Sequence, residues 1–97
     1  MRRTPRGITT EAYRYHCRLS VLAPAAVIAE HLGPTIAMVT AVDDTRCEVT
    51  VGSNSLDEVA LYVGLLGHEV VVLKPAELAA HFADVGSRLL RAAGASR

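Results

Sequence analysis

The histidines are the residues of this sequence whose chemistry is most versatile, because imidazole serves as a general base and as a metal ligand. None of them forms an H-x-x-x-H pair with another histidine or joins a C-x-x-C motif. The sequence also has no P-loop, no G-x-G-x-x-G and no G-x-S-x-G motif. It therefore predicts no metal site, no cofactor and no catalytic centre, so we expect a protein that is not an enzyme. The histidines are His16, His31, His68 and His81.

The two cysteines and one pair of acids leave alternatives open. Cys17 and Cys47 fall on strands that we expect to be neighbours. Either the two cysteines contact each other across the strands, or each is a small buried hydrophobic residue. Asp43 and Asp44 could suggest a metal loop, but a tight hairpin turn also favours aspartate for its own backbone. Two cysteines are too few for a disulfide framework.

One polar pattern could bind a ligand. Arg14, His16 and Arg18 alternate with apolar residues, so on a strand they would share its solvent-facing side. Such a basic ladder could hold a phosphate or another anion. Alternatively, it is a solvated or interdomain face in which an arginine pairs with Glu48. The sequence names these three residues as candidates for binding an effector or anion.

The elements that position this ladder follow from hydrophobic periodicity. Alternation predicts strands at 13–22, 35–42, 46–51 and 69–73, with a turn at 43–45 and a loop at 52–54. Helical spacing predicts helices at 24–32, at 55–66 after a Ser55–Glu58 capping box and before Gly67, and from Pro75 to a stop at Gly94. The last helix carries one apolar stripe, at Leu78, Phe82, Val85 and Leu89.

This order predicts an α+β fold of the ferredoxin-like type. The β-α-β-β-α-β arrangement forms a four-stranded antiparallel sheet with two helices on one face, and an additional C-terminal helix follows. The last helix, a neighbouring domain or another subunit could cover the other face. A base-stacking RNA platform on that face is not expected, because the third strand has no aromatic residue.

Composition fits one small domain. Residues 1–11 look like a polar tail or linker, and residues 12–94 form the domain. Hydrophobic residues make up 51% of the 97, and the formal net charge is zero, so the whole chain has no general attraction to nucleic acid. We find no apolar run long enough to span a membrane and no signal-like segment, and we expect a cytoplasmic protein.

Three stretches resemble a known family. YRYHCRLSVLAPAAVIAEHL, AVDDTRCEVTVGSNSLDEVALYVGLLG and HEVVVLKPAELAAHFADVGSRLLRAAG are similar, in order and spacing, to the C-terminal extension of WYL-domain bacterial transcription regulators, known as the WCX domain. The sequence departs from the family at Glu58, where an aromatic residue is common. It also lacks the Trp-Tyr-Leu motif of the neighbouring domain and the winged helix-turn-helix, so the resemblance implies no direct promoter binding by this segment.

The resemblance implies a non-catalytic role in transcription regulation. A WCX domain would contribute to the effector response and to protein contacts, with the WYL domain of the same regulator or a second copy in a homodimer as partners. The chain would be either a piece of such a regulator or a stand-alone relative. The alternative function is a stand-alone ligand-binding domain for an anionic metabolite or a short single-stranded nucleic acid.

Overall fold

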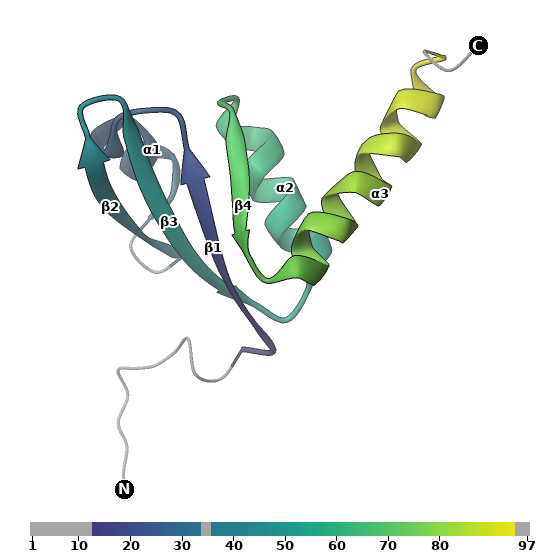
Figure 1. Ribbon diagram of the computed structural model, residues 1–97, viewed down its shortest axis with the longest axis horizontal. Helices are drawn as coiled ribbons and strands as arrows, with labels where there is room; N and C mark the ends of the chain where they lie inside the picture. Colours follow the sequence, from purple (N-terminus) through teal and green to yellow (C-terminus); the bar gives the residue numbers. More distant parts are fainter. Residues whose placement is uncertain (1–12, 34–35, 95–97) are drawn as a thin grey trace, which may run out of the picture.

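The computed structural model describes residues 13–33 and 36–94, and the predicted tail at 1–11 lies outside them. The expected order of elements is confirmed (Figure 1). The elements are β1 (Tyr15–Val21), α1 (Ala25–His31), β2 (Ala37–Asp43), β3 (Arg46–Ser53), α2 (Leu56–Leu66), β4 (Val70–Lys74) and α3 (Ala76–Ala92).

The four strands form one antiparallel sheet in the order β2-β3-β1-β4, as the ferredoxin-like plan requires. In the central pair, Leu19 lies opposite Val49 and Val21 lies opposite Cys47. These side chains are buried, whereas their neighbours along each strand are half-buried or exposed. The alternation in the sequence therefore identified the face of the central strands that carries the core.

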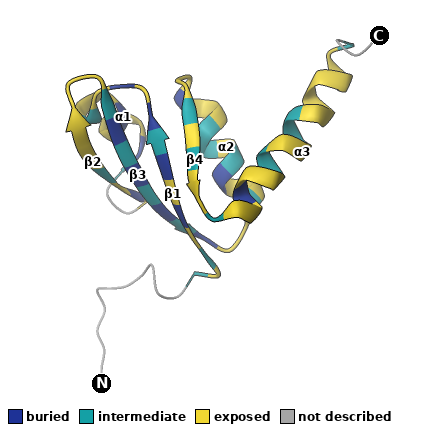
Figure 2. Cartoon of the chain, in the orientation of Figure 1, coloured by how far each residue is buried: buried dark blue, intermediate teal, exposed yellow. Residues whose placement is uncertain are grey.

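The core lies between this face of the sheet and the helices. Ile28 of α1, Val59 of α2 and Leu78 of α3 are all fully buried and join the strand residues in one cluster (Figure 2). Aliphatic residues dominate it. The helix α2 ends at Gly67, whose φ of 73° lies in the left-handed region that favours glycine.

Some boundaries differ from the predicted ones. The strand β1 begins at Tyr15 and not at Tyr13, so Arg14 precedes it. The strand β3 continues through Gly52 and Ser53, which were expected to form a loop, because they pair with His16 and Tyr15 of β1. The additional helix, α3, packs mainly against β4 and α2 and then runs away from the sheet, so it leaves the other face open (Figure 1).

Candidate functional site

The open face is the side of the sheet opposite α1 and α2. On the central strands it carries His16, Arg18 and Ser20 from β1, and Glu48 and Thr50 from β3. Arg18 lies opposite Thr50, and Ser20 lies opposite Glu48. Because residues two apart on a strand point the same way, these polar side chains form one continuous surface.

Arg18 and Glu48 form an ion pair at the centre of the open face. The guanidinium Nη2 lies 2.5 Å from Glu48 Oε1, and the two side chains are 44% and 34% exposed. Solvent screens a pair this exposed, so it contributes no more than about 1 kcal/mol to folding. The pairing of an arginine with Glu48, which the sequence left as one alternative, is therefore present.

The other two ladder residues lie differently. His16 is exposed on β1 opposite Gly52, on the same side as Arg18. Arg14 lies before the strand, where its backbone N–H donates a hydrogen bond to Asn54 Oδ1 at 2.9 Å. The structure thus brings His16 and Arg18 together on β1 and leaves Arg14 at the end of the sheet, beside the loop that leads into α2.

Two further cations reach the same face, and sequence analysis missed both. Lys74, the last residue of β4, lies opposite Arg18. Arg46 donates from Nη1 to Ser20 Oγ at 3.0 Å. Lys74 could have been found only with the register of β4, which shifts by a bulge between Arg18 and Leu19.

Apolar side chains flank this basic centre on the two edge strands. Met38 and Val42 of β2 are 68% and 54% exposed, and Val71 and Leu73 of β4 are 58% and 47% exposed. Large apolar residues that are exposed together on one face are a feature of surfaces that contact another molecule.

The cysteines belong to the core. Cys17 lies opposite Val51, and Cys47 lies opposite Val21, so the two residues are not cross-strand partners. Both are free and fully buried. Burial raises the pKa of the Cys17 thiol, with a further contribution from the Glu77 carboxylate, and burial also raises the pKa of Cys47. Each thiol therefore stays protonated and unreactive, as expected of a small buried hydrophobe.

The acidic pair near the hairpin shapes the turn. Asp43 Oδ1 accepts hydrogen bonds from the backbone N–H of Thr45 at 2.8 Å and from its hydroxyl at 2.9 Å. These bonds lower the pKa of Asp43 because they favour the ionised carboxylate. Within residues 13–33 and 36–94, no group of three or more His, Cys, Asp or Glu side chains is arranged to hold a metal ion.

Comparison with known families agrees with this architecture. The family model described as the WCX domain matches residues 13–90, which span the whole sheet and most of α3. The chain belongs to the WCX domain family. WCX domains are associated with WYL-type transcription regulators. No solved structure matches the WCX domain described here. Among its described helices, none has the length and apolar character needed to cross a bilayer.

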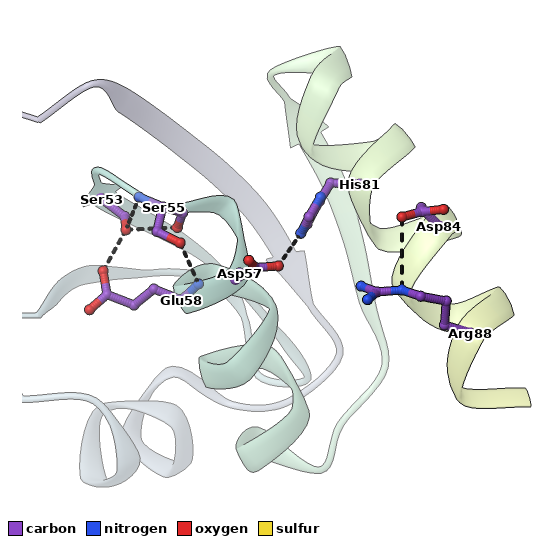
Figure 3. A network of polar contacts seen from close by, with 7 residues as sticks. All are labelled: Ser53, Ser55, Asp57, Glu58, His81, Asp84 and Arg88. Atoms are coloured by element: carbon purple, nitrogen blue, oxygen red, sulfur yellow. Dashed lines mark hydrogen bonds and ion pairs between the residues drawn. The ribbon is translucent and has the colours of Figure 1, made fainter. Parts of the chain in front are cut away.

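Glu58 has a local structural role at the start of α2 in this WCX domain. Ser55 caps α2 by accepting the N–H of Glu58 at 3.4 Å, as the capping box predicts. The Glu58 carboxylate does not return to Ser55. It accepts hydrogen bonds from Ser53 Oγ at 2.5 Å and from the Tyr62 hydroxyl at 3.3 Å, while Ser53 Oγ accepts the Ser55 N–H (Figure 3). The box thus includes a third residue, the fully buried Ser53.

Proposed function

We propose that this WCX domain is a non-catalytic regulatory and oligomerisation domain of a WYL-type transcription regulator in the cytoplasm. It would contribute to the effector response and to protein–protein contacts, with the WYL domain or a second copy as its partner. The observation that carries the proposal is the family match over residues 13–90. The open face supports contact with the WYL domain, because large apolar side chains are exposed on it.

The proposal is tested by titrating the isotope-labelled domain with the WYL domain of the same regulator and following its amide resonances. We expect saturable shifts on one contiguous surface. The same regulator is then assayed in a reporter strain with the WCX domain intact or deleted. A domain that binds no WYL domain, stays monomeric and leaves the reporter unchanged when deleted would contradict the proposal.

The basic side chains of the open face favour a second candidate function. His16, Arg18 and Lys74 lie on one surface, and Glu48 is the acid that neutralises part of their charge. We propose as the alternative that this surface binds an anionic metabolite or a short single-stranded nucleic acid. Arg14 stays a candidate at the margin of the surface.

A thermal-shift titration at low salt tests this alternative, with inorganic phosphate and a short oligothymidylate as the two probes. We expect stabilisation that is lost in the double variant Arg18→Ala with Lys74→Ala. Arg91→Ala, an exposed cation on α3, serves as the matched control. If neither probe stabilises the domain, or if the control loses as much binding as the double variant, the alternative is wrong.

A further inference from the structure

A groove between α2 and α3 lies outside the open face. The two helices separate from each other as α3 runs away from the sheet (Figure 1). The space between them has a volume of about 340 Å³. It is lined by Ala60, Leu61, Gly64 and Leu65 of α2 and by Leu89 of α3, with Asp57 and Arg88 as its charged members. This mainly apolar lining suits the apolar face of an amphipathic helix.

Only the first half of the apolar stripe of α3 is covered by other parts of the domain. Leu78 is fully buried and Phe82 is half-buried, but Leu89 is 64% exposed although it continues the same stripe. Leu90 beside it is 60% exposed, and Leu61 and Leu65 across the groove are 61% and 71% exposed. A protruding helical end makes few tertiary contacts that could stabilise it in water. Exposed leucines on both sides of one groove indicate a contact surface.

The charges around the groove differ between its two ends. At the closed end, Asp57 of α2 accepts a hydrogen bond from His81 Nε2 at 2.6 Å, and the acids Glu77 and Asp84 lie on the same half of α3 (Figure 3). At the open end, α3 carries Arg91 and also Arg88, whose Nε lies 3.9 Å from Asp84 Oδ2 one turn earlier (Figure 3). An antiparallel second α3 would bring its basic end to the acidic end of the first. A parallel one would place like charges together.

We propose that the groove binds α3 of a second copy of this domain, in an antiparallel and twofold-symmetric arrangement. Each copy would bury the Leu89 side of its α3 against α2 and α3 of the other, which makes a bundle of four helices. A Cβ atom at Gly64 would meet no atom within 4 Å, so the floor of the groove leaves room for a second helix to approach closely. This inference rests on the proposed function and names the surface through which oligomerisation occurs.

Sedimentation equilibrium of the full chain tests the groove with a pair of matched variants. Leu89→Glu places a charge in the groove, and Val71→Glu places the same charge on the open face, where the side chain is similarly exposed. We expect a dimer whose dissociation constant rises at least about tenfold in Leu89→Glu and stays unchanged in Val71→Glu. Circular dichroism confirms that both variants are folded.

A charge-reversal experiment tests the antiparallel arrangement. Arg88→Glu with Arg91→Glu makes the basic end acidic, and Glu77→Lys with Asp84→Lys makes the acidic end basic. Each double variant alone should dimerise less well than the wild type, because like charges then meet at both ends. An equimolar mixture of the two should form a heterodimer with affinity close to that of the wild type. A mixture that associates no better than either variant alone overturns the arrangement.

The outcomes separate this inference from the function on which it rests. A dimer that is lost in Val71→Glu and retained in Leu89→Glu would show that the open face is the interface, which refutes the groove but not oligomerisation. A wild-type chain that stays monomeric yet binds its WYL domain likewise refutes the groove alone. A chain that neither dimerises nor binds a WYL domain refutes both.

Discussion

At the scale of single residues, the polar groups that matter most to folding are near the start of α2. Among the described residues, Ser53 is the one polar residue that is fully buried. Its hydroxyl accepts a hydrogen bond from the Ser55 N–H and donates one to the Glu58 carboxylate. Ser55 and Glu58 are exposed, so each hydrogen bond to the buried hydroxyl contributes about 1 kcal/mol to stability. The resemblance singled out Glu58 as unusual, and the structure shows that Ser53 and Tyr62 both donate to it.

Ser53→Ala should therefore destabilise the domain by about 1–2 kcal/mol, because it removes one hydrogen-bond partner from the Ser55 N–H and one from the Glu58 carboxylate. Urea unfolding followed by circular dichroism measures the free energy of unfolding. Ser87→Ala is the matched control, since Ser87 is exposed on α3, and it should change stability by less than about 0.5 kcal/mol. Equal stability of the two variants would show that the hydroxyl network contributes nothing.

The buried thiols predict how stability depends on alkaline pH. Burial raises the folded-state pKa of Cys17 and Cys47 above their ordinary value of 9.0. Above that pH the unfolded chain loses thiol protons that the folded chain keeps, so stability is complete below pH 9.0 and falls as the pH rises through the folded-state values. The double variant Cys17→Ala with Cys47→Ala should be less stable overall, but its unfolding free energy should fall less steeply between neutral and alkaline pH. The same slope in both proteins would contradict this prediction.

At the scale of elements, local signals predicted what local interactions determine. The Ser55 cap and the Gly67 stop set the bounds of α2, and both depend on residues within one turn. The ends of β1 and β3 were misplaced because they depend on pairing between distant segments. Gly52 and Ser53 have little strand propensity, yet they continue β3 because β1 lies beside them. Lys74 was missed on the open face for the same reason.

Replacing Gly64 and Gly67 by alanine should change the stability of the domain in opposite directions. Gly67 has a φ of 73°, so Gly67→Ala should cost about 1 kcal/mol through backbone strain, although nothing lies within 4 Å of the new methyl group. Gly64 lies inside α2 in equally open space, so Gly64→Ala should stabilise the helix by up to about 1 kcal/mol. Thermal unfolding at low protein concentration compares them. If both substitutions changed the melting temperature in the same direction, the backbone conformation at each glycine would not be what determines the effect of alanine.

At the scale of the whole molecule, the periodicity of α3 was predicted, but the surroundings of the helix were left open. The stripe from Leu78 to Leu89 is continuous in sequence, and its first half completes the core while its second half extends past the sheet. Periodicity shows which side of a helix is apolar, but it cannot show whether other elements of the domain pack against that side. The domain therefore consists of a sheet with a closed core and a helical end whose leucines are exposed.

Hydrogen exchange should detect this difference in stability within one molecule. In dilute solution, the amides of residues 87–92 should exchange much faster than those of β1 and β3, because the end of α3 has few contacts of its own. At concentrations where the dimer forms, their exchange should slow by at least about tenfold, whereas exchange in the central strands should change little. Leu89→Glu is the control and should exchange rapidly at both concentrations. Protection of residues 87–92 that does not depend on concentration would mean that the single domain stabilises its own last helix, and the case for a second copy in the groove would fail.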